Sequence, residues 1–525
     1  MRSIFLSLVT LVVAVDPIRA DVPAGTWRMT VELGPAQSVV FLVAFENTGG
    51  KWVGKYLGST NPLAPDTSID GVRVGPDRLQ FTIGSRDQRL AFDGKPAGNR
   101  VLGTLLIDGQ LLITALEPSK LTTFDRYELA KEVFASSATG PLLVAALQEL
   151  LQQATTKKAT VDEVRAWVDR ATKSAEPLGL RWQQGIAMGI TAALDGQPAF
   201  AAIALDEARR AERLIDPADE AIFQLEVVEA LVQALKAAGK ADEAAALAPR
   251  VAELEERDYK EASQRPSLPV DPFRGRAGAS ERIVLVEGFT SSGLQSAVGP
   301  DIAFEALGRA YKSSDVVRLQ YHVHFPSSDP LACPAAEARR TYYALAQPPG
   351  LALNGKLAID GQGGSRTAAL ALWIQVSAVI AKLIEQAPDA RIKAEAKRTG
   401  EVVAVKATVG VSRPGEKVRL RLALVEDIVR YRGSNGIRFH PSVVRGFIGG
   451  DEGIPMTKTS NEVSQTIDLA VVRKTLNALL DMRQKANPDT SIAIRPMALK
   501  GLSVVAFVQD DTTREVLQAL RVEVK

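Results

Sequence analysis

The chain is poor in the residues that build disulfides and most metal sites. Its 525 residues include a single cysteine, Cys333, and three histidines. One cysteine cannot form an internal disulfide, so the stability of the chain must come from packing. The sequence contains no Cys-x-x-Cys, His-Glu-x-x-His or Gly-x-Ser-x-Gly motif. The sequence therefore contains no motif that would indicate a zinc module or a serine hydrolase.

Strong charge bias and long apolar segments are also missing. The 63 lysines and arginines nearly balance the 61 aspartates and glutamates, so the overall charge gives no reason to expect a nucleic acid as partner. Beyond the N-terminus, no run reaches the roughly 18 apolar residues of a membrane helix. We therefore expect no nucleic-acid partner and no transmembrane segment in the mature chain.

The first 20 residues have the features of a secretory signal peptide. Met1 and Arg2 form a short basic start, residues 4–15 are apolar, and Asp16-Pro17 breaks the helix before Ala20. Cleavage after Ala20 predicts an exported protein, located in the periplasm or outside the cell.

Residues 21–124 show the pattern of an antiparallel β domain. Polar and apolar residues alternate strictly from Thr26 to Leu33, and further short apolar runs follow. Asp93-Gly94 and Asp108-Gly109 supply hairpin turns. We expect a small barrel or sandwich, whose interior is either filled by side chains or open to a ligand at its mouth.

From residue 125 to 262 the apolar period becomes helical. One apolar stripe contains Leu143, Leu147 and Leu150. The Ala-rich segments that follow loosely resemble tetratricopeptide-type hairpins, which predicts an α-helical hairpin region. Residues 263–280 are rich in proline, glycine and arginine, and we expect them to form an interdomain linker.

Residues 281–388 begin with a β-α-β pattern. Glu281 to Gly288 is an almost continuous apolar run, which is typical of a strand buried on both faces. The next segment, Ala297 to Tyr311, predicts a helix. Ser314 to Val323 predicts a second buried strand, parallel to the first.

The first strand, the loop and the start of the helix resemble those of thioredoxin-like proteins. In these proteins a strand ending Glu-Leu-Phe-Thr leads into Cys-x-x-Cys at a helix N-terminus, with an aspartate shortly after. Glu287, Phe289, Thr290 and Asp301 match this pattern, while Gly288 replaces its leucine. The resemblance implies a thioredoxin-like α/β domain over residues 281–388.

The resemblance places the two redox cysteines at Leu294 and Ala297. Neither side chain can form the thiolate that attacks a disulfide or the second thiol that resolves the mixed disulfide. We therefore expect no catalytic residue here, and a domain that binds a protein or peptide without redox activity. The loop residues Ser291, Ser292 and Gln295 are candidates for that binding.

The same resemblance places the family's cis-proline at Pro349, directly after Pro348. In the family this proline faces the redox loop. A cis bond there predicts an exposed strand edge able to grip an extended peptide, which makes Pro349 a further binding candidate.

Three side chains carry the alternative hypotheses. Cys333 precedes a predicted helix, so it is either a passive loop cysteine or the reactive thiol of a one-cysteine oxidoreductase or peroxidase. His322 and His324 alternate along the second strand, at the sheet edge where ligands bind. They are either hydrogen-bonded binding residues of a cleft or part of a copper or zinc site, with Cys333 or His440 as further ligands. No other cofactor is expected.

Residues 389–525 return to strands, with one helix from Val471 to Lys485. Their order after the thioredoxin-like segment resembles exported thioredoxin domain-containing proteins with an immunoglobulin-like C-terminal domain. The sequence thus predicts a multidomain α+β protein: an N-terminal antiparallel β domain, a helical-hairpin region, a thioredoxin-like domain and a C-terminal β-sandwich. We expect a binding or scaffolding module of the cell envelope, with an unidentified protein or peptide as partner.

Overall fold

The structure is a computed structural model that describes residues 24–34, 37–61, 66–85, 89–107, 109–136, 140–360, 363–486 and 495–525. The predicted signal peptide at residues 1–20 lies outside the described residues. The described chain is a mixed α+β protein, as predicted. It divides into two compact units, one ending at Glu261 and the other beginning at Ala262.

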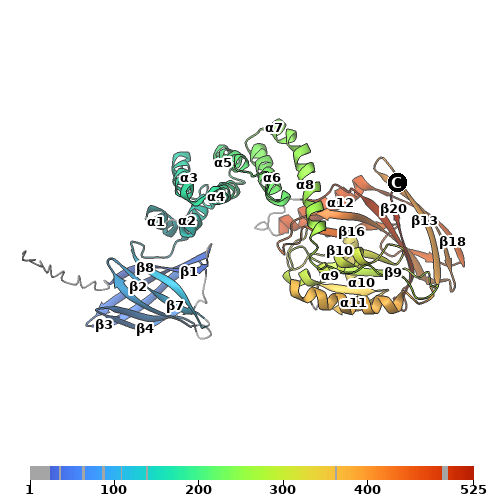
Figure 1. Cartoon of the computed structure of the whole chain (residues 1–525), viewed down its shortest axis with the longest axis horizontal. Coiled ribbons are helices and arrows are strands. Elements are labelled where there is room, and N and C mark those ends of the chain that lie inside the picture. Colours follow the sequence, from blue (N-terminus) through green and yellow to red (C-terminus); the bar gives the residue numbers. More distant parts are fainter. Residues whose placement is uncertain are drawn as a thin grey trace, which may run out of the picture. The chain divides into compact units, whose positions relative to one another are not determined.

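The first unit opens with a closed antiparallel barrel (Figure 1). Each strand pairs with the next along the chain, and β8 closes the barrel on β1. Of the two predicted forms, barrel and sandwich, the structure has the barrel. Its strands are β1 (Gly25–Gly34), β2 (Gln37–Thr48), β3 (Lys51–Ser59), β4 (Ser68–Gly75), β5 (Arg78–Gly84), β6 (Arg89–Ala97), β7 (Arg100–Ile107) and β8 (Gln110–Ser119).

Alternate side chains of these strands form the apolar interior of the barrel. Met29 and Val31 of β1 are completely buried, and the stacked rings of Phe81 and Phe92 lie 4.8 Å apart among them. This alternation is the pattern that made the barrel strands recognisable in the sequence.

One strand, β4, lacks the alternation of apolar and polar residues by which the other barrel strands are recognised. Only Ile69 of its side chains is buried, and Gly71 adopts a left-handed backbone conformation with φ +63° at an irregularity in the pairing with β5. The bulge breaks the alternation of apolar and polar residues on which recognition of a strand depends.

The rest of the first unit is helical, as predicted, and consecutive helices pack on one another. Local capping fixes two of the helix starts: Asp125 caps α1, and Thr160 with Glu163 forms a capping box on α3. The helices are α1 (Arg126–Ala135), α2 (Gly140–Gln152), α3 (Val161–Ala175), α4 (Leu180–Ala193), α5 (Ala201–Arg213), α6 (Ala221–Ala237), α7 (Ala241–Ala246) and α8 (Ala248–Gln264).

The second unit is built on a large mixed sheet with the order β12-β11-β9-β10-β16-β15-β19-β20, and β17 pairs with β15 off this path. β9 and β10 are parallel, as predicted, while β11 runs antiparallel to β9. The strands are β9 (Val284–Thr290), β10 (Val316–His322), β11 (Gly350–Leu353), β12 (Lys356–Asp360), β15 (Gly415–Arg430), β16 (Phe439–Ile448), β17 (Ile454–Met456), β19 (Leu502–Asp510) and β20 (Val516–Glu523).

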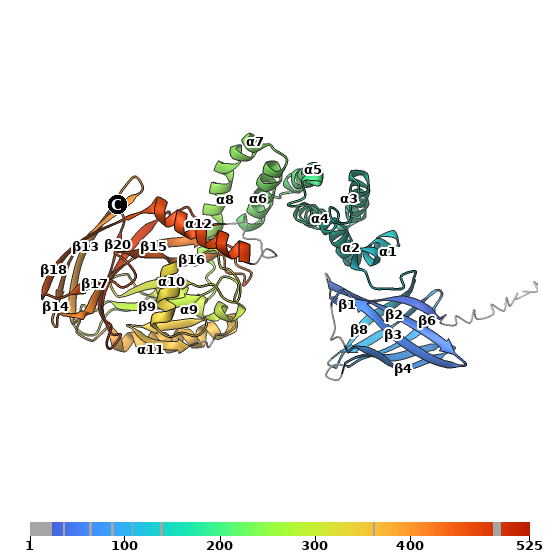
Figure 2. The same cartoon turned by 180° about the vertical axis from the view of Figure 1, so that it is seen from behind.

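A smaller sheet and, among the described residues, the helices α9 to α12 complete this unit. The strands β13 (Ala390–Thr399), β14 (Val402–Val411) and β18 (Ser460–Asp468) form the smaller sheet, in which β13 and β14 are an antiparallel hairpin. The helices are α9 (Val298–Ala310), α10 (Pro334–Tyr342), α11 (Ala369–Leu383) and α12 (Leu469–Ala486). Buried residues of α9 and α11 pack with β9 and β11 in one apolar cluster (Figure 2).

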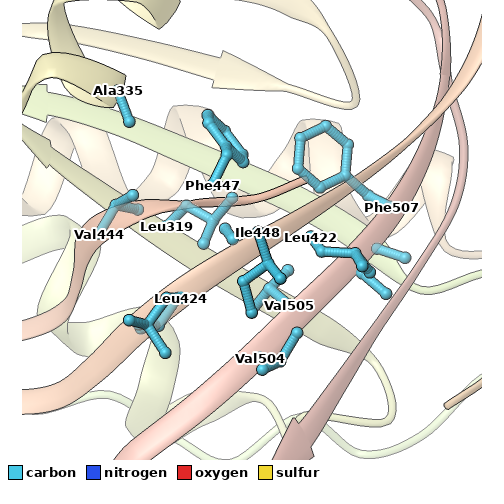
Figure 3. Close-up of a cluster of buried hydrophobic side chains, with 14 of the residues drawn as sticks. Leu319, Ala335, Leu422, Leu424, Val444, Phe447, Ile448, Val504, Val505 and Phe507 are labelled. Carbon is cyan, nitrogen blue, oxygen red and sulfur yellow. The ribbon is translucent and has the colours of Figure 1, made fainter. Parts of the chain in front are cut away.

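The large sheet continues across the boundary predicted between residues 388 and 389. β16, from the C-terminal part, pairs directly with β10. A single core contains Leu319 of β10, Ala335 of α10, Phe447 of β16 and Phe507 of β19 (Figure 3). The two predicted domains therefore share one sheet and one core.

The segment predicted to be a linker has neither helix nor strand from residue 265 to 283, yet it packs on the second unit. The ring of Phe273 lies 5.0 Å from that of Tyr311. Arg276 donates hydrogen bonds to the carbonyl oxygen of Ile384 and pairs with Asp315. Arg276 and Phe273 thus hold the segment against the rest of the second unit.

Candidate functional site

The candidate site lies where the parallel strands β9 and β10 end beside each other. Thr290, the last residue of β9, is paired with His322, the last residue of β10. The carboxyl ends of parallel strands form the edge at which open α/β sheets usually bind ligands. After β9 the chain passes through a short loop and a 3-10 turn, Gln295–Ala297, into α9.

Leu294 and Ala297 lie at the start of that helix, as the sequence predicts. Leu294 caps the 3-10 turn, which continues directly into α9. Ala297 is completely buried, whereas Leu294 is half-buried. The two positions that the resemblance assigns to redox thiols therefore hold aliphatic side chains at a helix N-terminus.

The loop between β15 and β16 covers the segment before these positions. Asn435 donates hydrogen bonds to the carbonyl oxygens of Ser291, through its side chain at 3.4 Å, and Ser292, through its backbone at 3.3 Å. A Cβ atom on Gly433 would lie only 2.1 Å from the carbonyl oxygen of Ser292. Ser291 and Ser292 are consequently buried, so a partner on the surface would contact Gln295 rather than either serine.

An open pocket of about 540 Å³ lies beside this covering loop. Gln295 is exposed there, and its side chain donates a 2.9 Å hydrogen bond to the carbonyl oxygen of Ser434. The residues that line the pocket are Gln295, Ser296, Val298, Gly363, Gly364, Ser365, Arg366 and Asn435. Gln295 is the predicted binding residue that the structure places at an accessible surface.

All three histidines of the chain come together around Asp329. His322 Nδ1 donates to Asp329 Oδ2 at 2.9 Å, and the backbone N–H of Asp329 donates to His324 Nδ1 at 3.1 Å. The rings of His322 and His440 meet edge to face with centroids 4.8 Å apart. His440 Nε2 in turn donates to the carbonyl oxygen of Tyr431 at 3.0 Å. His440 had entered the sequence analysis only as a further metal ligand.

Burial and hydrogen bonds together set the protonation of this cluster. Burial alone would raise the pKa of Asp329, but the adjacent His322 and hydrogen bonds from His322, Ser292 N–H and Leu331 N–H outweigh it, and the pKa falls to about 2. Burial lowers the pKa of His440 to about 3, helped by the neighbouring His322. At neutral pH an ionised Asp329 therefore orients His322, while His440 is neutral.

A second buried carboxyl, Asp301 of α9, lies on the same edge. It accepts hydrogen bonds from Thr290 Oγ1 at 2.8 Å and from the Gln320 side chain at 3.2 Å. Burial raises its pKa to about 6, against the opposing influence of His322 and Thr290. The aspartate that matched the family pattern thus belongs to a polar network inside the sheet edge.

The cluster contains the parts of a general base, since a carboxylate orients an imidazole. His322 Nε2 and His440 Nδ1 are buried with no hydrogen-bond partner among the described residues. Both rings are completely buried, so no substrate reaches them in this conformation. Within the described ranges, no three His, Cys, Asp or Glu side chains come together in a way that could hold a metal ion.

Cys333 lies in the core, away from the position that a redox thiol needs. Its side chain is completely buried and donates to the carbonyl oxygen of Val444 on β16 at 3.3 Å. Burial raises the pKa of the thiol to about 11. A reactive cysteine needs the opposite shift, so the geometry favours the passive interpretation of Cys333.

Pro349 is preceded by a cis peptide bond, as predicted. The expected exposed strand edge is not found here, because Pro349 is buried and the following strand, β11, is paired on both sides, with β9 and β12. The sheet neighbours of β11 occupy the backbone groups that an extended peptide would need.

A buried ion pair behind the site was missed by sequence reasoning. Arg339 of α10 donates to Glu287 Oε1 through Nη2 at 2.7 Å and through Nε at 3.1 Å. Tyr321 and Tyr343 also donate to this carboxylate. Glu287 had been noted only as a match to the family pattern, because nothing in the sequence pairs it with an arginine 52 residues later.

Comparisons of the chain with protein-family models, curated proteins and solved structures find no match.

Proposed function

We propose that the second unit contains a thioredoxin-like domain that has lost its redox chemistry and binds a protein or peptide. The observation that carries the proposal is the pair of aliphatic residues, Leu294 and Ala297, at the start of the helix that follows β9. Aliphatic side chains can neither attack a disulfide nor resolve one.

The arrangement of the strands supports the thioredoxin-like part of this proposal. A β-α-β unit, β9-α9-β10, is followed by α10, an antiparallel hairpin of β11 and β12, and then α11. The sheet order β12-β11-β9-β10 places the hairpin beside β9. This is the arrangement expected from the resemblance of residues 281–388.

The accessible surface supports a binding role. Gln295, Ser296 and Arg366 offer amide, hydroxyl and guanidinium groups in the pocket beside α9. Such groups suit recognition of a polar peptide or protein surface.

Restoring the thiols tests the fold and the loss of chemistry together. The wild-type chain should not reduce insulin, and Cys333→Ser should change nothing. The double variant Leu294→Cys with Ala297→Cys should form an internal disulfide, and the thiol at residue 294 should have a pKa below that of free cysteine because of the helix N-terminus. Thiol titration and insulin reduction measure both effects.

The matched control is Ala371→Cys with Ile374→Cys, the same spacing on the exposed face of α11. These thiols lie inside a helix and should titrate as ordinary cysteines. Insulin reduction by the wild-type chain, or ordinary thiols at residues 294 and 297, would contradict the proposal.

Binding is tested by a photo-crosslinking residue placed at Gln295 in the full chain. We expect specific crosslinks to a protein of the native cell envelope, reduced by excess unlabelled chain. The same residue at Lys406, exposed on β14, should give none. Equal crosslinking at the two positions would argue against a binding surface beside α9.

A further inference from the structure

Helix α11 presents an unusually apolar outer face. In the segment Arg366–Leu383 the mean hydropathy is 1.3 and only 17% of the residues are buried. Leu370 and Ile374, one turn apart on the helix, are 53% and 59% exposed, and Val379 on the opposite flank is 37% exposed. Large apolar side chains exposed in this way mark an interaction surface.

The segment Arg366–Leu383 is, by length and composition, long and apolar enough to cross a membrane. However, Val376, Ile380 and Ile384 on its inner face pack with Val286 of β9 and Leu351 of β11. Crossing a bilayer would expose these contacts and the sheet beneath them, so α11 is suited to lie on a surface.

The charged residues at the two ends of α11 indicate which kind of surface the helix contacts. Residues 363–385 contain the two cations Arg366 and Lys382 and one carboxylate, Glu385, which accepts hydrogen bonds from the backbone N–H groups of Ala277 and Gly278. Both cations are exposed, one before the helix and one in its last turn. A helix with an apolar face bracketed by cations matches a bilayer that carries anionic headgroups.

Three aromatic residues on and beside the helix pack on the core beneath it and keep part of their rings exposed, which agrees with this assignment. The rings of Phe273 and Tyr311 are 5.0 Å apart, and those of Tyr311 and Trp373 are 6.3 Å apart. All three side chains are half-buried. Tyrosine and tryptophan, with an apolar body and a polar end, are enriched at the level of lipid headgroups.

A second copy of the chain fits the face less well. A helix of 15 residues is about 22 Å long and about 10 Å wide, which gives roughly 200 Å² of contact, far below the roughly 800 Å² per partner of a stable interface. An antiparallel pair would place Arg366 against the Lys382 of the other copy, and a parallel pair would place like residues together. Either arrangement brings cations together.

We propose that α11 is an interfacial helix that rests its outer face on a lipid bilayer with anionic headgroups. The inference is independent of the function proposed for the site beside α9. It requires neither a membrane-crossing segment nor a change in the fold.

Vesicle flotation with the full chain tests the proposal. The wild-type chain should float with vesicles of phosphatidylcholine and phosphatidylglycerol, and much less with phosphatidylcholine alone. Leu370→Glu with Ile374→Glu should lower the affinity for the vesicles about tenfold or more, because burying the exposed part of each side chain contributes a factor of about three or more. The matched control, Leu111→Glu with Ile113→Glu on β8, alters residues that are 68% and 74% exposed and should not change binding.

A site-specific probe gives an independent readout. A polarity-sensitive dye on Ile374→Cys should brighten several-fold on anionic vesicles, whereas the dye on Leu111→Cys should not. No flotation of the wild-type chain, unchanged flotation of the α11 variant, or a dimer that the α11 variant converts to a monomer would overturn the proposal. Circular dichroism of each variant verifies that it is folded.

Discussion

The two large β structures of this protein are assembled in opposite ways. In the barrel each strand pairs with its neighbour in the sequence. In the sheet of the second unit, β10 pairs with β16, and β15 lies between β16 and β19. Apart from the closing pair of β1 and β8, barrel strands therefore pair with strands next to them in the sequence, whereas the sheet depends on contacts between distant segments. Local patterns consequently describe the barrel well and the sheet incompletely.

The largest expected difference between the two β structures is the ability of a fragment of each to fold independently. A fragment of residues 21–124 should keep protected amides, because every barrel strand has both its partners within it. A fragment of residues 281–388 should be largely unfolded, because Leu319 and Phe289 would lose the core that they share with Phe447 and Phe507. Hydrogen exchange of the two fragments measures this contrast. Full protection in the second fragment would show that residues 389–525 are dispensable for it.

The next largest difference is expected in the stability lost when a buried ion pair or an exposed ion pair is broken. Arg339→Ala should destabilise the second unit by about 3 to 5 kcal/mol, because it leaves the buried carboxylate of Glu287 without its cation. Arg78→Ala removes an exposed pair with Asp93 in the barrel and should leave the barrel essentially unchanged. Hydrogen exchange of β9 and of β5 reports the two effects separately. A mild effect at Arg339 would mean that Tyr321 and Tyr343 suffice for Glu287.

Loss of stability in the pH range of histidine titration should belong to the second unit, because all three histidines of the chain lie in it. The pKa of His440 is lowered from 6.5 to about 3, so between these values the unfolded chain binds more protons and stability falls as the pH is lowered. Asp301, with a pKa raised to about 6, acts in the opposite direction between about pH 4 and 6. The two effects partly cancel in the wild-type chain.

The variant His440→Gln separates the contribution of His440 to the pH dependence of stability from that of Asp301. Relative to this variant, the wild-type chain should lose roughly 3 kcal/mol between pH 7 and pH 4. His322, Asp329 and Arg445, the charged or titratable groups that act on His440, are unchanged in the variant. Amide exchange in β10 and β16 across this range measures the difference. Identical pH dependence of the two proteins would mean that His440 is accessible to protons in the native state.

The smallest expected effect concerns the loop that covers the site. Gly433→Ala places a methyl group against the Ser292 carbonyl oxygen and should cost about 1 to 3 kcal/mol, confined to faster exchange in residues 431–438. Gly415→Ala meets no atom within 4 Å and serves as the control. Equal exchange in both variants would indicate that the loop does not rest on Ser292.

Much of the candidate site could be anticipated from the sequence. The apolar runs of β9 and β10 predicted two parallel strands, which placed His322 and the loop after β9 at one sheet edge, because parallel strands end together. The resemblance to thioredoxin-like proteins singled out Leu294 and Ala297 in that segment. His440, Asn435 and Gly433 reach that edge from a distant part of the chain through the pairing of β16 with β10. No local pattern indicates that pairing, so the burial of Ser291 and Ser292 could not be predicted.

The sequence by itself determined the single thiol, the aliphatic residues at 294 and 297, the alternating barrel strands and the helical periods, since each depends on residues close together in the chain. The tertiary structure decided which sheet β16 joins, that the three histidines meet at Asp329, that Arg339 neutralises Glu287, and that the apolar outer face of α11 stays uncovered by its own unit. These features depend on which distant surfaces exclude water together, and that outcome belongs to the whole fold.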